Sequence, residues 1–195
     1  MIPIRKLKHG LLALACVLAV TAQASAEPAP APEAHRDGRH DFDFEFGTWK
    51  THLQRRLKPL TGSNTWVEYD GVSTLQPIWK GDGNVGELDV AGPAGRIQGL
   101  TVRLYNPASR QWNITFANHA QGTLGLPLVG GFENGRGEFY DQEMLGDRAI
   151  FARFIFSGIT TRSFKLEQAF SGDGGKTWEA NWIATFEKVS DKVGP

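Results

Sequence analysis

The feature that most constrains this fold is a regular succession of short apolar runs separated by turn residues. No long window repeats its apolar positions with a helical period, and Gly and Pro recur too often to leave room for one. Many sequential hairpins must either close on themselves or leave exposed sheet edges. The pattern therefore predicts an all-β fold, an antiparallel up-and-down β-barrel of about eight to ten strands. The expected strands cover residues 48–57, 65–75, 84–90, 96–105, 111–118, 129–140, 149–159, 163–170 and 178–188.

The first 26 residues have the parts of a secretory signal peptide. A basic start precedes an apolar run from Gly10 to Val20, which is too short to span a bilayer, and the small-x-small site Ala24-Ser25-Ala26 follows. We expect cleavage after Ala26 and a periplasmic or secreted protein. Lipoprotein processing before Cys16 is the alternative, but the residues around Cys16 fit that pattern poorly. The mature chain then contains no cysteine, which excludes disulfides and thiolate sites.

Composition limits the partners of the mature chain. Signal cleavage removes three basic residues and no acidic one, which leaves 18 basic against 21 acidic residues and a formal charge of −3. We therefore expect no nucleic-acid partner and no membrane insertion after cleavage. Residues 27–40 form a Pro/Ala/charged segment without apolar periodicity and are predicted to be a disordered tether. Residues 41–190 suffice for a single domain, whose oligomeric state the sequence does not specify.

The stretch Ser171-Gly172-Asp173-Gly174-Gly175-Lys176-Thr177-Trp178 specifies a turn almost completely. Its Asp can bond the backbone two residues on, and its glycines accept φ > 0, so it predicts a hairpin between the last two strands. The spacing Ser-x-Asp-x-Gly-x-Thr-Trp resembles the Asp-box of sialidase propellers, where the motif is structural. We expect a structural role here too, and we expect the final strand to close the sheet near the first.

Two further resemblances concern the whole domain. Gly47-Thr48-Trp49 is similar to the Gly-x-Trp that opens the first strand of lipocalins and other calycins, where the Trp packs across the closed end of the barrel. The segments Val102 to Trp112, Gly135 to Tyr140, Glu167 to Ser171 and Trp178 to Trp182 resemble a family of mostly bacterial, often secreted proteins known as a domain of unknown function. That resemblance covers about residues 41–189 and implies a calycin-like barrel. It assigns no activity and no catalytic residues.

In a barrel of this size, alternate residues either fill the interior or line a cavity. The inward candidates are Trp49, Thr51, Thr101, Arg103, Tyr105, Trp112, Ile114, Phe116, Asn118, Ala152, Phe154, Phe156, Leu166, Gln168, Trp178, Trp182 and Phe186. Most of these are expected to be core. Polar members are more informative, because a buried polar group needs a partner. For Arg103, a structural pair with Glu138 or Glu167 competes with ligand contact. Ligand contacts are predicted for Arg103, Tyr105, Trp112, Asn118, His119, Gln168 and Trp182.

Histidines offer little evidence for a metal or cofactor. His35 and His40 lie near Asp41 and Asp43 and could form at most a weak surface metal site. His52 is expected on the outer face. His119 ends a strand beside the glycine-containing loop 122–131, a typical place for a barrel mouth. Haem would need His52 or His119 as an axial ligand. We expect no metal and no cofactor.

Three functions remain open. The leading hypothesis is a binding protein that holds a small apolar or aromatic molecule in the barrel and performs no catalysis, because motifs for nucleophilic, phosphate or metal chemistry are missing. The second is an enzyme acting on a small lipophilic substrate, which requires groups such as His119, Tyr105, Arg103 and Glu138 to converge in one pocket. The third is an interaction module with a solid core.

Overall fold

The computed structural model describes residues 36–193, and the predicted signal peptide lies outside this range. Among these residues no helix has the length and apolarity needed to cross a membrane.

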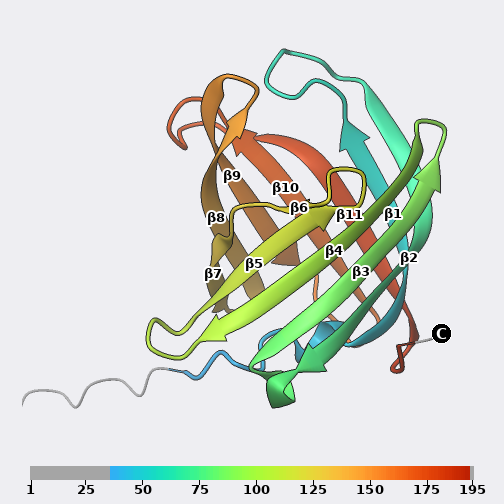
Figure 1. The fold of residues 1–195 in the computed structure, drawn as a ribbon, viewed down its shortest axis with the longest axis vertical. Coiled ribbons are helices and arrows are strands. Elements are labelled where there is room, and N and C mark those ends of the chain that lie inside the picture. The colour runs from blue at the N-terminus through green and yellow to red at the C-terminus, as the bar shows by residue number, and fades with distance from the viewer. Residues whose placement is uncertain (1–35, 194–195) are drawn as a thin grey trace, which may run out of the picture. The chain divides into compact units, whose positions relative to one another are not determined.

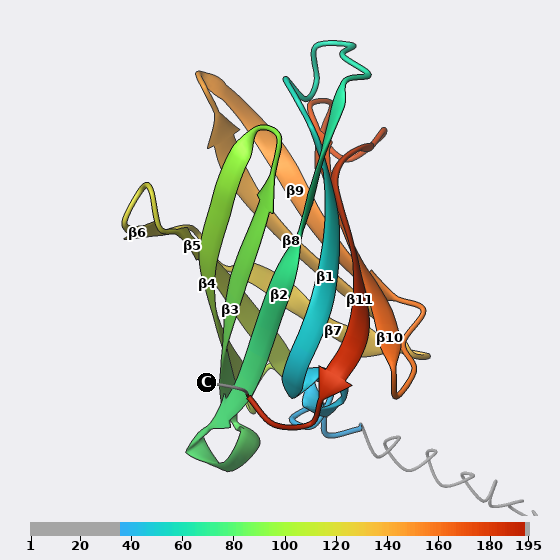
Figure 2. The same cartoon turned by 90° about the vertical axis from the view of Figure 1, so that its right-hand side faces the viewer.

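The described chain is a closed antiparallel barrel (Figure 1). Ten of its eleven strands pair in chain order, and β1 pairs with β11 to complete the ring, as the sequence predicted. The turned view in Figure 2 shows β1 between β2 and β11. The strands are β1 (Gly47–Arg56), β2 (Trp66–Ile78), β3 (Gly83–Gly92), β4 (Gly95–Asn106), β5 (Gln111–Asn118), β6 (Thr123–Leu124), β7 (Leu128–Glu133), β8 (Arg136–Leu145), β9 (Arg148–Ser157), β10 (Ser163–Ser171) and β11 (Glu179–Ser190), with 3-10 turns η1 (Asp43–Glu45) and η2 (Trp79–Gly81).

One predicted strand was wrong. The run 129–140 is not continuous, because the chain reverses at Asn134-Gly135 between β7 and β8. Both turn residues have positive φ, 50° and 75°, and Asn-Gly is the dipeptide that tolerates this best. Because the chain reverses at this turn, a new strand, β8, begins at Arg136. It extends to Leu145, beyond Tyr140, where the expected strand ended.

The segment before β1 closes one end of the barrel. Gly38 lies in the stretch predicted to be a tether, yet it is buried: its N–H donates to Tyr105 Oη at 3.1 Å and its carbonyl accepts from Trp112 Nε1 at 2.8 Å. Trp49 Nε1 donates to the Glu45 carbonyl at 2.6 Å, so the Trp of the Gly-x-Trp packs at this closed end. The last residues of the expected tether are therefore packed on the barrel.

Phe42 is the centre of the aromatic cluster at the closed end and is fully buried. Its ring lies edge-on to Trp112, Phe132 and Phe156, at centroid distances of 5.1, 4.9 and 5.3 Å. These edge-to-face contacts are the geometry that aromatic rings prefer. They fix the lead-in across the end of the barrel.

At the opposite end the wall is incomplete. β5 meets β7 at three residue pairs, and the last two residues of β5 pair with the short β6 instead. β7 pairs with β8 no further than Tyr140. Beyond that point, β8 has β9 as its one strand partner in the described chain. The barrel is therefore shut at the lead-in and open beside β8.

The turn between β10 and β11 is braced by Asp173. Its carboxylate accepts the Thr177 hydroxyl at 2.6 Å, the Thr177 N–H at 3.0 Å and the Ser171 hydroxyl at 2.8 Å. These bonds hold the pKa of the Asp173 carboxyl well below its usual range, and the two from Thr177 contribute most to the lowering. Gly174 and Gly175 both have positive φ. The predicted hairpin is present, and its hydrogen bonds are internal.

We predict that Asp173→Ala lowers the thermal midpoint at pH 7 and leaves ligand binding intact. Because ionisation of this carboxyl is favoured in the folded state, its contribution is complete above the unfolded pKa of about 4 and is lost as the pH falls below it. Circular dichroism melts at pH 7 and at about pH 3 should therefore show a difference from wild type that shrinks in acid. Asp147→Ala, in the exposed turn between β8 and β9, is the control. An unchanged midpoint at pH 7 would contradict this role.

Candidate functional site

The barrel encloses an inner hollow of about 110 Å³. Most of its lining is apolar and comes from alternate residues of the strands, which point inward as predicted. The apolar lining residues are Leu53, Leu75, Leu88, Ile114, Phe116, Phe154, Phe156, Leu166, Trp182, Ala184 and Phe186. The apolar part of this lining favours an apolar occupant over water.

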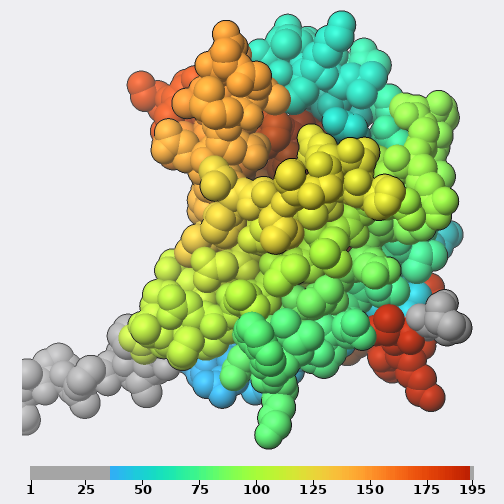
Figure 3. Space-filling view, viewed as in Figure 1, coloured from blue at the N-terminus to red at the C-terminus, as the bar shows by residue number. Residues whose placement is uncertain are grey.

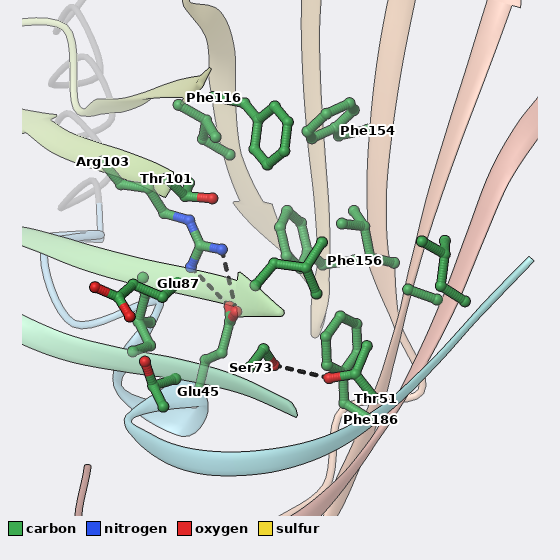
Figure 4. A pocket seen from close by; sticks show the side chains of 18 of the residues that line it. Glu45, Thr51, Ser73, Glu87, Thr101, Arg103, Phe116, Phe154, Phe156 and Phe186 are labelled. Atoms are coloured by element: carbon green, nitrogen blue, oxygen red, sulfur yellow. Dashed lines mark hydrogen bonds and ion pairs between the residues drawn. The ribbon is translucent and has the colours of Figure 1, made fainter. Parts of the chain in front are cut away.

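A buried ion pair forms the polar floor of the inner hollow (Figure 4). Arg103 donates from Nη1 to Glu45 Oε2 at 2.7 Å and from Nη2 to Oε1 at 3.1 Å, while the two side chains are 6% and 9% exposed. The guanidinium also lies 4.3 Å from the centroid of the Phe42 ring. The expected partners of Arg103, Glu138 or Glu167, were therefore wrong: the lead-in supplies the carboxylate.

A second hollow of about 450 Å³ lies at the open end. It shares Phe116, Phe154, Gln168 and Trp182 with the inner hollow, so these four residues lie between the two, and we call them the waist. Figure 3 shows the depression between the orange β8–β9 hairpin, the cyan β1–β2 loop and the yellow segment before β7. We call this second hollow the mouth hollow.

Two carboxylates of β8 line the mouth hollow. Asp141 and Glu143 are half-buried and alternate with the exposed Gln142 and Met144, so they lie on the inward face. Burial raises the pKa of Asp141 to about 6. Burial, and then the charge of Asp141, raise the pKa of Glu143. Sequence reasoning missed both acids, although a strand restarted at Asn134-Gly135 would have placed them in phase with the buried Phe139.

A β-bulge brings an amide into the same hollow. The register steps from Gln168↔Trp182 to Ala169↔Ala180, which leaves Asn181 without an opposite residue on β10. A bulge re-aims the extra side chain, and here Asn181 and Trp182 both line the mouth hollow. Asn181 Oδ1 accepts from Gln168 Nε2 at 2.9 Å. Asn181 is another residue that the strand alternation could not have identified.

The seven predicted ligand-contact residues fall into three places. Arg103, Gln168 and Trp182 line the inner hollow, and Gln168 and Trp182 also line the mouth hollow with Asn118. Tyr105 and Trp112 are buried at the closed end, where they bond Gly38. His119 is exposed, and neither hollow in the described chain includes it.

Trp178 is not inward-facing as expected. It lies in the turn before β11, its ring 4.5 Å from the Arg153 guanidinium carbon and 6.0 Å from the Tyr140 ring, and both of those residues alternate with inward ones. The Asp173 turn, which reverses the chain up to Thr177, displaces Trp178 from the strand phase.

The groups proposed for catalysis do not converge. Glu138 accepts from Arg136 and Tyr140 on the outer surface at 2.7 Å each, Tyr105 is at the closed end and His119 is exposed. His52 pairs with Asp70 at 2.9 Å in a solvent-exposed pair. Residues 36–193 contain no cluster of three or more His, Cys, Asp or Glu arranged for a metal ion. The enzyme hypothesis, as formulated with these four residues, is not supported.

Comparisons with known proteins bear on the fold. No protein-family model and no curated protein sequence matches the chain. One similar structure is the S-type phycobiliprotein lyase CPES from Guillardia theta, with a TM-score of 0.56 and 11% identity, covering 80% of this chain and 94% of that one. Another is Rv2717c from M. tuberculosis, with a TM-score of 0.53 and 10% identity, covering 80% of this chain and 99% of that one. The structure of EF1p2_mFAP2b bound to DFHBI has a TM-score of 0.43 at 11% identity, covering 78% of this chain and 99% of that one. The fold is a calycin-like barrel.

We predict that Asp141→Asn raises stability at neutral pH. The pKa of this acid is raised on folding, so the folded state binds its proton more tightly, and the ionised form costs stability increasingly between about pH 4 and pH 6. Allowing for the screening of a half-exposed side chain, the gain at pH 7 is about 1 kcal/mol, or about 3 °C in Tm. Melts at pH 7 and pH 4 check it, because the gain should vanish at pH 4. Asp147→Asn is the matched control, and a destabilised variant at pH 7 would contradict the prediction.

Proposed function

We propose that this protein binds a small, largely apolar or aromatic molecule inside the barrel and performs no chemistry on it. The observation that carries the proposal is the pair of adjoining hollows that share the waist residues Phe116, Phe154, Gln168 and Trp182. A concave apolar site with a few convergent polar groups is the usual form of a small-molecule site. The hollows also count against an interaction module with a solid core.

The two volumes define how a ligand would lie. The inner hollow, about 110 Å³, is somewhat smaller than the roughly 150 Å³ cavity that accepts benzene in an engineered protein. The mouth hollow, about 450 Å³, is within the range of about 300–1,000 Å³ that is typical of ligand pockets. We infer that a narrow apolar end passes the waist and that the larger part of the ligand stays in the mouth.

We also propose that the protein acts in the periplasm or outside the cell. The basic start, the short apolar run and the Ala24-Ser25-Ala26 site support this location. Intact-mass analysis of the protein recovered from the periplasm or the medium should give a chain that begins at Glu27. A protein retained in the cytoplasm with residues 1–26 attached would overturn the location, and it would leave the binding proposal untouched.

Ala184→Leu should block binding. Ala184 is 2% exposed and lines the inner hollow, so three added carbons occupy the space that the ligand needs. We expect an affinity loss of about tenfold or more with a thermal midpoint close to that of wild type, because an existing hollow is filled. Native mass spectrometry against a panel of lipophilic compounds, together with the change in tryptophan fluorescence, measures the affinity.

The same substitution at an exposed position is the control for this test. Ala149→Leu, on the exposed part of β9, should leave affinity unchanged. The proposal that a ligand binds in the inner hollow is wrong if wild-type protein binds none of the panel, or if the Ala184→Leu variant binds as tightly as wild type.

A further inference from the structure

The mouth hollow contains a buried donor whose bonding is incomplete. Asn181 is 4% exposed, and its Nδ2 has no hydrogen-bond partner among residues 36–193. Gln168 holds the other end of the amide at 2.9 Å, which fixes its plane. A buried amide N–H without a partner is costly, so native proteins rarely keep one unless water or a ligand completes it.

An acceptor in the same hollow is also incomplete. Asp141 Oδ1 is shielded from solvent and has no partner in the described part of the chain. Glu143 stands two residues along on the same face of β8. Desolvation raises the pKa of Asp141, which agrees with a carboxylate whose hydrogen bonds are unmade. The hollow therefore offers an unused amide donor on Asn181 and an unused carboxylate acceptor on Asp141, in addition to the unpartnered Nε of Arg56.

The charges around the mouth argue against a purely ionic head group. Arg55 at the end of β1 and Lys58 in the turn after it line the same hollow as Asp141 and Glu143 of β8. Arg56 is held by Glu179 at 3.3 Å. A simple ammonium would meet the basic side, and a simple carboxylate would meet the acidic side. A neutral head group avoids both repulsions.

We propose that the mouth selects a ligand whose apolar body carries a neutral polar head with both an N–H donor and an oxygen acceptor, of which a primary carboxamide is the simplest example. Asp141 accepts from the donor, and Asn181 Nδ2 donates to the acceptor. This inference rests on the proposed function, because it names the ligand class of the same site.

A matched pair of probes tests the assignment. 1-Naphthaleneacetamide carries a donor and an acceptor, and methyl 1-naphthaleneacetate carries an acceptor without the N–H donor. We expect wild-type protein to bind the amide about tenfold more tightly than the ester, the ratio typical of one buried hydrogen bond. Calorimetry at pH 7.5 or displacement of a fluorescent apolar reporter gives the two dissociation constants.

Two variants should fail in different ways. Asp141→Leu removes the acceptor on the protein. The affinity for the amide should therefore fall about tenfold, and the affinity for the ester should stay unchanged. Asn181→Leu removes the donor, so the two probes lose affinity by similar factors and the preference for the amide survives. Asn113→Leu and Asp147→Leu, at positions that line neither hollow, should change nothing. If Asp141→Leu does not fold, Asp141→Asn should show the same loss of preference to a smaller degree.

The outcomes separate this inference from the proposed function. Equal binding of amide and ester by wild type, or an Asp141→Leu variant that loses affinity for both probes by the same factor, overturns the head-group assignment while barrel binding stands. Failure of both probes and of the whole lipophilic panel overturns both proposals.

Discussion

The buried pair of Arg103 and Glu45 is the interaction on which the rest of this structure depends. Removing either partner would leave an unpaired charge inside the barrel, which is far more costly than never burying the pair. Arg103 belongs to β4 and Glu45 to the lead-in, so the pair is satisfied when the lead-in lies across the barrel end. The same segment brings Phe42 over the guanidinium and Gly38 against Trp112. Closure of that end and neutralisation of the floor are therefore one event.

The two ends of the barrel differ in how their buried polar groups are hydrogen-bonded. At the closed end, the indoles of Trp49 and Trp112, the Tyr105 phenol and the two terminal nitrogens of Arg103 find partners on the lead-in, whereas Arg103 Nε has none in the described chain. At the open end, β8 runs past the last residue that pairs with β7, and both Asp141 and Asn181 keep an atom without a partner in the described chain. Such groups lower stability unless something completes their bonds. Unpartnered buried atoms also occur away from the mouth hollow, on Asn84 and Arg103, so the proposed ligand site rests on a donor and an acceptor that lie in one hollow.

Local signals predicted much of this fold, whereas the site depended on details those signals miss. Strand alternation and Gly/Pro turns gave the barrel, and the Gly-x-Trp placed Trp49 at the closed end. The overlooked Asn134-Gly135 turn hid Asp141, since a strand ending at Tyr140 cannot include it. Glu45 could not be assigned to Arg103 because the two are 58 residues apart and no periodicity links a lead-in to a strand. Proximity to a glycine-containing loop favoured His119, but its side chain is exposed.

Affinity and selectivity would then come from different parts of the barrel. Apolar contacts in the inner hollow would stabilise any bound molecule of suitable size. One methylene more or less would change the binding free energy only modestly. An unpaired buried donor acts in the opposite sense, because a ligand without a matching acceptor leaves Asn181 as unsatisfied as it was in the empty barrel. A ligand with the matching acceptor gains that bond, so the discrimination equals the free energy of one buried hydrogen bond. In the proposed function, the polar groups of the mouth would therefore determine which apolar molecule is accepted, while the apolar linings of both hollows would supply the less selective part of the binding surface.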